Sequence, residues 1–476
     1  MRKRLKGGPG TTRPLPNRIR QNRHPAHPKG ILGWGDRFRR LLWSWWFWGA
    51  AAGLAAAGDH SRWCVALLAV AAFVYIAQPS EHSPVYGLDH DFSIGSDQFL
   101  TTIAGATGTP FSPNSSLQIY NNGDEFYPAM IDAIHGAKNS ISIEAYIYWA
   151  GHVGRLFANA LAEKARAGIA VRILLDAVGS STIGKEIIDT LQSSGCVVRW
   201  YRPVHWYTIN RINHRTHRKS LIIDGHVGFT GGAGIADHWM GNAENAEHWR
   251  DIQVRIQGPA VMQLQTGFAQ NWLKTTGELL TGSDYYPKYH KEGSLKVQTI
   301  VSSPETGSST VRIMYYLSIV CAREVIWIAN PYFIPDQAAI DILQEAKRRG
   351  VDVRIMVAGI HNDNRLARLN SVRLYGDLLK SGIKILEYNQ TMLHQKYMVC
   401  DHLWCTVGTT NFDSRSLSLN DENSVCIYDA AIAARFEQIF TQDLQFCKEI
   451  KIKTWRRRGL GLRAVETMVS LLKDQA

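Results

Sequence analysis

The feature that most constrains this chain is an internal duplication. Two stretches of equal length, Leu161–Ile173 (LAEKARAGIAVRI) and Leu343–Ile355 (LQEAKRRGVDVRI), are identical at seven of 13 positions. Gly168 and Gly350 occupy the same place in both, where a helix has to stop before a strand begins. Glycine adopts the left-handed conformation needed there at little cost. Matches in the same order along the chain indicate two copies of one α/β unit.

Each copy has the apolar periodicity of a strand, a helix and a second strand. Further along, LQSSG at 191–195 matches LLKSG at 378–382, again directly before an apolar run. The expected elements are strands at Ser140–Tyr148 and Ala170–Asp176 around a helix at Leu156–Ala167, and strands at Glu324–Ile334 and Val351–Val357 around a helix at Ile340–Arg349. The predicted fold class is therefore α/β, built as a tandem repeat.

Both copies then carry the same polar signature, His-x-Lys followed by Asp five residues after the lysine. It occurs as His217, Lys219 and Asp224, and again as His394, Lys396 and Asp401. One such motif is expected by chance in about one of twenty chains of this length, so two at equivalent places are a strong signal. Each Asp lies beyond an apolar stretch, which leaves open a second interpretation, that it only begins a turn.

The spacing of histidine and lysine suits phosphate chemistry. Residues two apart in a strand project from the same face, so each histidine is expected beside its lysine. The lysine would neutralise phosphate oxygens while the histidine attacks phosphorus or moves a proton. Two copies facing each other would place two histidines on opposite sides of one phosphorus, as in-line displacement requires.

A histidine that acts as a nucleophile needs its other ring nitrogen held by a carboxylate. Asp251 and Glu422 are the candidates, and they follow His217 and His394 at similar separations. Four other histidines do not have the spacing of a usual zinc ligand set and are interpreted as surface or hydrogen-bonded residues. They are His214, His226, His238 and His248.

Positive charge is concentrated at the N-terminus. The chain has 53 Lys+Arg and 41 Asp+Glu, a formal net charge of +12. Residues 1–40 contain twelve of the basic residues and one acid, Asp36, so the rest of the chain is nearly neutral. A near-neutral body disfavours a nucleic-acid partner, because such binders usually carry a basic face on the domain itself.

Two uncharged runs follow the basic residues, Leu41–Gly58, which contains four tryptophans, and Trp63–Ala77. As helices they would span roughly 27 and 22 Å, and the hydrocarbon core of a bilayer is about 30 Å thick. They fit a two-helix membrane hairpin, which we prefer, one span plus an interfacial helix, or a cleaved signal. A hairpin would return the rest of the chain to the cytoplasmic face, where the basic residues stay.

The paired motifs resemble the phospholipase D superfamily, and their flanks are similar to those of the bacterial cardiolipin synthase family. The resemblance covers about residues 113–450. The stretches that carry it are Asn213–Lys219, Phe229–Gly232, Trp249–Asp251, Asn330–Phe333, Gly408–Ser416 and Leu419–Glu422.

This resemblance implies two α/β/α sandwich lobes related by a pseudo-twofold axis, with one active site between them and no required metal or cofactor. It also implies a phosphatidyl-histidine intermediate, with His217 as nucleophile and His394 as general acid and then base. The residues alone leave open which histidine attacks, because the motifs are nearly symmetric. The remaining implied roles are phosphate binding by Lys219, Lys396 and Asn411 and orientation of the histidines by Asp251 and Glu422.

Two positions depart from the family pattern. Gly234 stands where the first lobe usually has an asparagine after its Gly-Gly pair, which removes one donor to the phosphate. Tyr397 stands where a serine or threonine commonly follows the second lysine. Both departures leave the reaction rate and the choice of headgroup open.

The implied activity is a membrane-anchored phosphatidyltransferase that joins two phosphatidylglycerols into cardiolipin and releases glycerol. Its expected place is the inner membrane of a bacterium, with the lobes on the cytoplasmic face. Rival interpretations are a phospholipase D-type hydrolase, another headgroup transferase, a nuclease of the same superfamily, and a non-catalytic membrane scaffold.

The predicted organisation has six parts, and the seven scattered cysteines are expected as reduced core thiols. The C-terminal basic run fits either an anionic lipid surface or a solvated helix face. The parts are a basic disordered tail (1–40), a membrane segment (41–77), a linker (78–112), a first lobe (113–290, motif region 211–238), a second lobe (291–450, motif region 388–415) and a basic C-terminal helix or tail (451–476).

Overall fold

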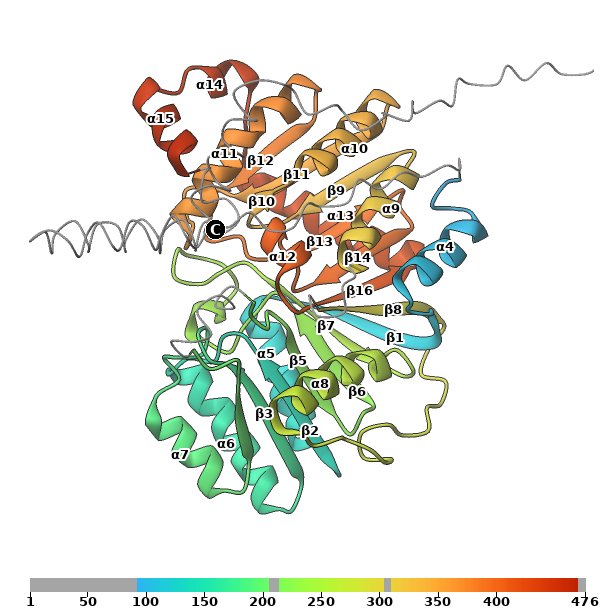
Figure 1. Cartoon of the computed structure of the whole chain (residues 1–476), viewed down its shortest axis with the longest axis vertical. Helices are drawn as coiled ribbons and strands as arrows, with labels where there is room; N and C mark the ends of the chain where they lie inside the picture. The colour runs from blue at the N-terminus through green and yellow to red at the C-terminus, as the bar shows by residue number, and fades with distance from the viewer. Residues whose placement is uncertain (1–91, 205–213, 304–309, 470–476) are drawn as a thin grey trace, which may run out of the picture. The chain divides into compact units, whose positions relative to one another are not determined.

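The computed structural model describes residues 92–204, 214–303 and 310–469. Within these ranges a mixed sheet of 15 strands runs through both copies, in the order β17-β12-β11-β9-β13-β14-β16-β8-β1-β7-β6-β5-β2-β3-β4. Counted outward from the central pair, β8 (Leu295–Ser302) and β1 (Ser112–Asn121), the two halves have matching orders. β8 and β1 pair antiparallel, so a pseudo-twofold axis passes between them (Figure 1).

The first lobe begins with β1 and is the lower half of Figure 1. Its other elements are α5 (Asn122–His135), β2 (Ser140–Ala145), α6 (His152–Arg166), β3 (Ala170–Asp176), α7 (Lys185–Ser193), β4 (Val197–Tyr201), β5 (Lys219–Ile223), β6 (Val227–Gly231), β7 (Ile252–Gln257) and α8 (Val261–Thr276).

The second lobe begins with β8 and repeats the same order with additions. Its other elements are α9 (Thr310–Cys321), β9 (Val325–Ala329), β10 (Phe333–Ile334), α10 (Gln337–Arg348), β11 (Asp352–Ala358), α11 (Arg365–Lys380), β12 (Lys384–Tyr388), β13 (Tyr397–Cys400), β14 (Trp404–Gly408), β15 (Phe412–Asp413), α12 (Ser414–Ser418), β16 (Glu422–Tyr428), α13 (Ala430–Asp443) and β17 (Cys447–Glu449).

The strand–helix–strand units predicted from periodicity are confirmed in both lobes, as β2-α6-β3 and β9-α10-β11. Gly168 and Gly350 have φ of 90° and 97°, the left-handed conformation expected at those helix ends. The strand predicted at Glu324–Ile334 is interrupted, because β9 ends at Ala329 and β10 starts at Phe333. Pro331 lies in the gap and has no N–H for a ladder hydrogen bond.

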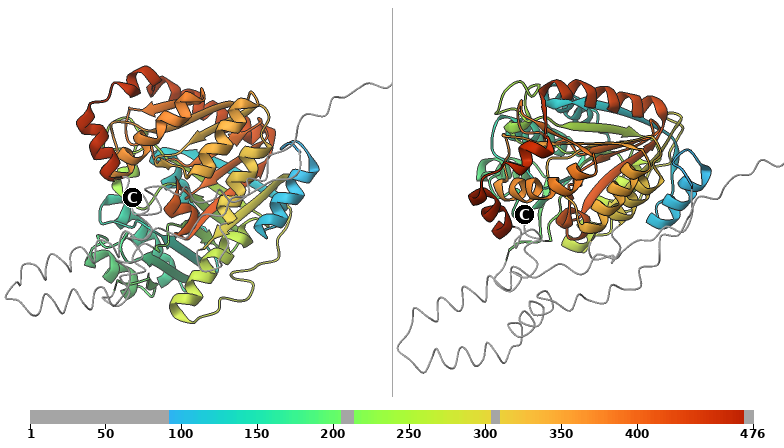
Figure 2. Two further views of the ribbon diagram at one scale, coloured as in Figure 1. Left: turned by 45° about the horizontal axis from the view of Figure 1, so that its top comes forward. Right: turned by 90° about the horizontal axis from the view of Figure 1, so that it is seen from above.

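Helices cover both faces of each half of the sheet (Figure 2). In the first lobe α8 covers the face of Glu144, whose carboxylate accepts a hydrogen bond from Asn271 (2.7 Å). In the second lobe Trp404 donates to Ser318 of α9 (2.8 Å), while Tyr397 packs against Phe436 of α13 on the opposite face. Side chains of the neighbouring strands β14 and β13 thus pack into opposite helical layers, as expected for the sandwich that the family resemblance implies.

Part of the range 78–112, predicted to be a linker, is instead a packed helix. α4 (Asp97–Thr107) buries Phe99 and Ile103 in the hydrophobic core of the second lobe. The Phe99 ring meets the edge of Trp404, with 5.1 Å between centroids. The correction follows from amphipathicity, because a helix with one apolar stripe has to bury it.

The basic C-terminal run forms two short helices, α14 (Ile452–Arg456) and α15 (Leu460–Val469), next to α11 (Figure 1). Trp455 anchors them by donating its indole N–H to the Val372 carbonyl (2.7 Å). Arg456 and Arg457 are exposed. The helix-face interpretation of this run therefore matches its local structure.

The predicted basic tail (1–40) and membrane segment (41–77) lie outside the described residues. Across the described ranges, no helix has both the length and the apolar character needed to cross a bilayer. Six of the cysteines lie in these ranges, all as free thiols and five of them buried, as predicted for core residues.

Candidate active site

The two predicted histidines lie directly before equivalent strands, His217 before β5 and His394 before β13, and are 8% and 5% exposed. The backbone around each one is bound to the opposite lobe. His217 donates its N–H to the carbonyl of Asp421 (2.9 Å), and His394 donates to the carbonyl of Arg250 (2.8 Å). These segments form short parallel bridges that cross between the lobes, so both histidines meet at one interface.

The carboxylates are exchanged between the lobes. Nδ1 of His217 lies 3.0 Å from Oε1 of Glu422, and Nδ1 of His394 lies 2.8 Å from Oδ2 of Asp251. The sequence identifies both carboxylates, but their similar separations within each copy do not reveal that each pairs with the histidine of the other copy. Because a carboxylate occupies each Nδ1, the Nε2 atoms are left to act on a substrate.

The two carboxylates differ in their electrostatics. Burial raises the pKa of Glu422 to about 7, although the charge of Lys219 opposes this. Burial also acts to raise the pKa of Asp251, but the hydrogen bond and charge of His394 and the charge of Lys396 bring it below its usual range. Asp251 is therefore ionised at neutral pH, whereas Glu422 is near its midpoint.

The pKa values of the two histidines also differ. Burial and the charges of Lys219 and Lys396 lower the pKa of His217 well below its usual value. Burial and Lys396 also lower the pKa of His394, but the hydrogen bond to Asp251 partly offsets this effect. His394 is therefore the imidazole better able to hold a proton.

Both predicted lysines are buried beside the histidines. The Lys219 ammonium donates to the His217 carbonyl (2.9 Å) and lies 5.4 Å from the ring centroid of Tyr146. The Lys396 ammonium lies 3.1 Å from Nδ1 of His394. Burial and repulsion from the like charge of Lys396 lower the pKa of Lys219 to about 7, and burial lowers that of Lys396 to about 8. An anion between the two ammonium groups would relieve both effects.

Two further residues hold the carboxylates, and the motif analysis did not identify them. Thr409 donates its hydroxyl to Glu422, and the indole of Trp239 donates to Asp251 (2.9 Å). Trp239 also packs against the His394 ring, with 5.2 Å between centroids. Thr409 lies in the Gly-rich strand end that follows the second motif, so its place in the sequence could have indicated it. Trp239 reaches the site only through the tertiary fold.

The two departures from the family pattern have separate explanations. Asn411, predicted to bind phosphate, is buried, and its Oδ1 makes no hydrogen bond among the described residues. At the equivalent Gly234 a Cβ would lie 2.9 Å from the Ile147 side chain, so an asparagine has no room. Tyr397 packs against α13, on the face of β13 opposite to Lys396, and so stays out of the site.

Asp224 and Asp401, which the sequence predicts in the catalytic group, bind backbone N–H groups at turns in the structure. Asp224 accepts three backbone N–H groups, from residues 138, 139 and 140, at 2.7–2.9 Å. Asp401 accepts three from residues 323, 324 and 325 at 2.8–3.1 Å. Each follows its strand with φ near 50° and fixes the start of the neighbouring strand. This geometry is that of the turn interpretation.

Three of the four other histidines have aromatic or acidic neighbours. His248 contacts Glu244, His226 packs against Tyr289, and His238 lies between Trp149 and Trp249. In the parts of the chain that the structure describes, no three His, Cys, Asp or Glu side chains are grouped as a metal site.

Comparison with known proteins places the two motifs in a family. The family model described as "Cardiolipin synthase, PLD-like domain" matches residues 130–272 and 318–444, so each matched range contains one His-x-Lys motif.

Several curated proteins are similar over most of the chain. Cardiolipin synthase 2 of Bacillus anthracis is 36% identical over 354 residues, which cover 74% of this chain and 69% of that protein. Cardiolipin synthase of Geobacillus sp. (strain WCH70) is 34% identical over 367 residues, covering 76% and 73%.

Among solved structures, phosphatidylserine synthase from Haemophilus influenzae Rd KW20 superposes with a TM-score of 0.64, covering 79% of this chain and all of that one. At 15% sequence identity, this likeness shows the fold alone.

Proposed function

Since the chain belongs to the phospholipase D-like cardiolipin synthase family, and is a phosphatidyltransferase, we propose that it joins two phosphatidylglycerols through a covalent intermediate on His217. The products would be cardiolipin and glycerol. The observation that carries the mechanism is the exchange of carboxylates, because it joins residues of both lobes at one interface and occupies Nδ1 rather than Nε2 of each histidine.

In the first half-reaction, Nε2 of His217 attacks the phosphorus of the donor lipid and the bond to the glycerol oxygen breaks. His394 gives its proton to that oxygen, so glycerol leaves neutral. In the second half-reaction, His394 takes a proton from a hydroxyl of the acceptor lipid. The resulting oxygen attacks phosphorus, the phosphorus–nitrogen bond breaks, and both histidines return to their starting states.

The electrostatics support this assignment of roles. A general acid has to start protonated, and His394 is the better candidate of the two histidines, because the ionised Asp251 partly offsets the lowering of its pKa. A nucleophile has to start neutral, and burial beside two lysines keeps His217 neutral. Lys219, Lys396 and Asn411 would bind the phosphate oxygens, which restores charge balance around the two ammonium groups.

We further propose that residues 41–77 anchor the chain in a bacterial inner membrane, with the lobes on the cytoplasmic side. The support is the sequence pattern, with two uncharged runs preceded by basic residues. Anchoring would favour transfer over hydrolysis, because it presents the acceptor lipid at high local concentration.

Lipid analysis tests the proposal. Membranes containing the full chain are incubated with phosphatidylglycerol, and the expected products are cardiolipin and glycerol. Phosphatidic acid without cardiolipin would favour a hydrolase, and no lipid product with cleaved DNA would favour a nuclease; either would overturn the proposal. His217→Ala should remove product, while His402→Ala is the matched control, because His402 is half exposed and pairs with Glu437 away from the site.

A further inference from the structure

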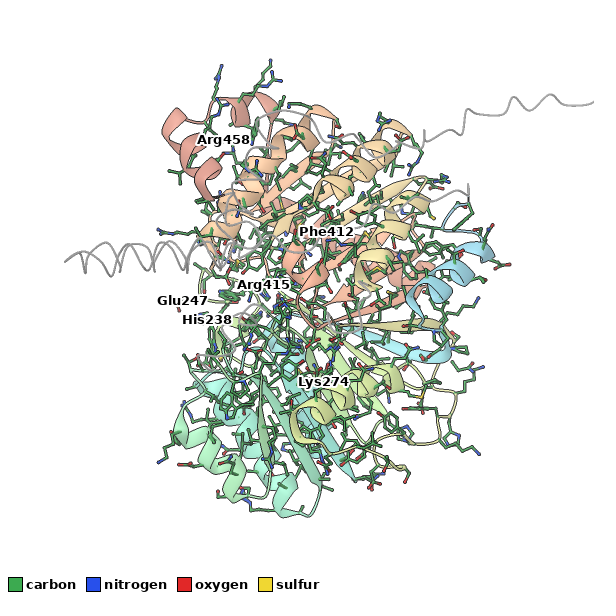
Figure 3. All side chains as sticks on the ribbon, in the orientation of Figure 1. His238, Glu247, Lys274, Phe412, Arg415 and Arg458 are labelled. Atoms are coloured by element: carbon green, nitrogen blue, oxygen red, sulfur yellow. The ribbon has the colours of Figure 1, made fainter. Side chains whose placement is uncertain are left out.

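A group of arginines lies beside the catalytic histidines on one side only. Arg215 precedes His217 by two residues in the segment that crosses to the other lobe. The equivalent position before His394 is Met392. The second lobe instead contributes Arg415, from α12, and Figure 3 shows its position at the boundary between the lobes. The first side of the site thus has two cations that the motif symmetry does not require.

Arg415 has no use inside the protein that the structure reveals. Among the described residues its Nε is buried without a hydrogen-bond partner. Its charge reaches the active site, because it adds to burial and the nearer cations in lowering the pKa of His217, and it opposes the rise that burial causes in the pKa of Tyr146. A buried guanidinium nitrogen without a partner is costly unless a ligand satisfies it.

Arg215 is buried and fixed by contacts within the protein. It is 3% exposed, and its Nη1 donates to the carbonyl of Arg202 (2.9 Å) and lies 3.8 Å from Oδ1 of Asp176. Burial and then the charges of Arg202 and Arg415 lower its pKa, although Asp176 opposes them. The backbone brings the two arginines together, because the carbonyls of Arg415 and Arg215 accept the N–H groups of consecutive residues, Asn420 and Asp421 (both 3.0 Å).

Three carboxyls lie within electrostatic reach of these arginines. Asp176 faces Arg215, Asp413 acts on Arg415, and Asp363 acts with both arginines on Tyr146. Burial raises the pKa of Asp176, and it raises that of Asp413 to about 6. The buried Nε of Arg415 has no hydrogen-bond partner among the described residues, and such a group next to a phosphate-transfer site favours a second bound anion.

The proposed reaction brings a second anion to this place. The donor lipid has a single phosphate, bound by the histidines and lysines. The acceptor lipid carries a phosphodiester of its own, and one glycerol joins it to the reacting phosphorus. Arg215 lies two residues before His217 in the same crossing segment, on the side from which this second phosphodiester could be bound.

We propose that Arg215 and Arg415 form a subsite for the phosphodiester of the acceptor phosphatidylglycerol. The proposal rests on the proposed function and explains how the site would prefer a lipid acceptor to water or a small alcohol. Neither water nor a neutral alcohol carries the phosphate that the arginines bind, so the arginines would determine the acceptor and leave donor cleavage to the histidines.

The test separates acceptor use from donor cleavage. The full chain and its Arg415→Met variant are incubated with phosphatidylglycerol vesicles in the presence of ethanol. Cardiolipin, phosphatidylethanol and phosphatidic acid are then quantified from the same samples. In the variant, cardiolipin formation is expected to fall roughly tenfold or more. Phosphatidylethanol plus phosphatidic acid, which report donor cleavage, should change by less than about threefold.

Three comparisons complete the design. Arg415→Lys should recover part of the cardiolipin, because it restores the charge. Arg215→Met should shift the products in the same direction. Arg435→Met is the matched control, because Arg435 is exposed on α13 and contacts only Gln438 in the described structure. It should behave as the unsubstituted chain.

Equal loss of cardiolipin and phosphatidylethanol in Arg415→Met would overturn the subsite, because the arginine would then serve the donor or the fold. An unchanged product ratio would overturn it as well. An unsubstituted chain that makes phosphatidylethanol but no cardiolipin would instead contradict the proposed function.

Discussion

The two half-sites share a backbone but not their side-chain chemistry. In one, Glu422 holds His217 and is itself held by the hydroxyl of Thr409. In the other, the shorter Asp251 holds His394, and the equivalent of Thr409 is Gly232, where a Cβ would lie 2.2 Å from the Asp251 carboxylate. A duplicated fold thus places two histidines symmetrically, while local packing decides how polar each carboxylate's surroundings are.

The layer beneath the histidines is also unlike in the two lobes. Under His217 the buried Arg218 donates to the carbonyl of Gly267 (2.7 Å) and its charge acts on Asp421, which comes from the other lobe. Under His394 the corresponding residue is Gln395, which shares the carboxylate of Asp443 with Arg250 from the other lobe (2.7 and 3.0 Å). The other lobe thus contributes a negative residue, Asp421, under His217 and a positive residue, Arg250, under His394. The two crossing segments are therefore not interchangeable.

The largest expected effect breaks the symmetry between the histidines. His217→Ala and His394→Ala should each reduce turnover of phosphatidylglycerol by roughly 10³-fold or more. A phosphatidyl ester of p-nitrophenol needs no acid, because its leaving group is already stable as an anion. With that substrate His394→Ala should regain covalent labelling of the protein, measured by mass spectrometry, and His217→Ala should not. The reverse pattern would exchange the two roles.

The two carboxylates should also differ in how much turnover depends on them. Asp251→Asn removes the ionised partner of His394, the proposed general acid, and we expect a loss in kcat of roughly 10²–10³-fold. Glu422→Gln removes a partner that is only partly ionised, so the expected loss is smaller, about 10–10²-fold. Steady-state kinetics on both variants measures the difference. Equal losses would contradict it, and Glu437→Gln, at the exposed His402 pair, serves as the control.

The lysines predict the alkaline side of the pH profile. Each has to be protonated to bind phosphate, and their pKa values are lowered to about 7 at Lys219 and about 8 at Lys396. The ratio kcat/KM for phosphatidylglycerol should therefore fall as pH rises through this range. Lys219→Arg should move the fall to higher pH, because a guanidinium stays charged, whereas the exposed Lys384→Arg should not. An unshifted profile would show that another group titrates.

The smallest effect on activity is expected for the two aspartates that make the same backbone contacts in both lobes. Asp224→Ala and Asp401→Ala each remove the acceptor of three backbone N–H groups. Each should lower the free energy of unfolding by about 1–3 kcal/mol, measured by chemical denaturation, with kcat of the folded protein nearly unchanged. Asp189→Ala, at an exposed position on α7, is the control. A collapse of kcat without loss of stability would return these residues to the catalytic group.

Local patterns predicted what depends on nearby residues. The strands and helices around Gly168 and Gly350 followed from periodicity, because a residue's face and a helix end are set within a few positions. The same reasoning failed for α4, where an apolar stripe inside a predicted linker finds its partner in the distant second lobe. It also missed Trp239, which is 155 residues before the histidine it packs against.

By itself the sequence determined the duplication, the α/β class and the two His-x-Lys pairs, since each is written in spacings of a few residues that repeat. Only the tertiary structure decided that Glu422 serves His217 and Asp251 serves His394, because that pairing depends on how the lobes meet across β1 and β8. The unequal charge of the two half-sites was decided there as well. Burial and the positions of neighbouring ions set a pKa, and both are properties of the folded chain.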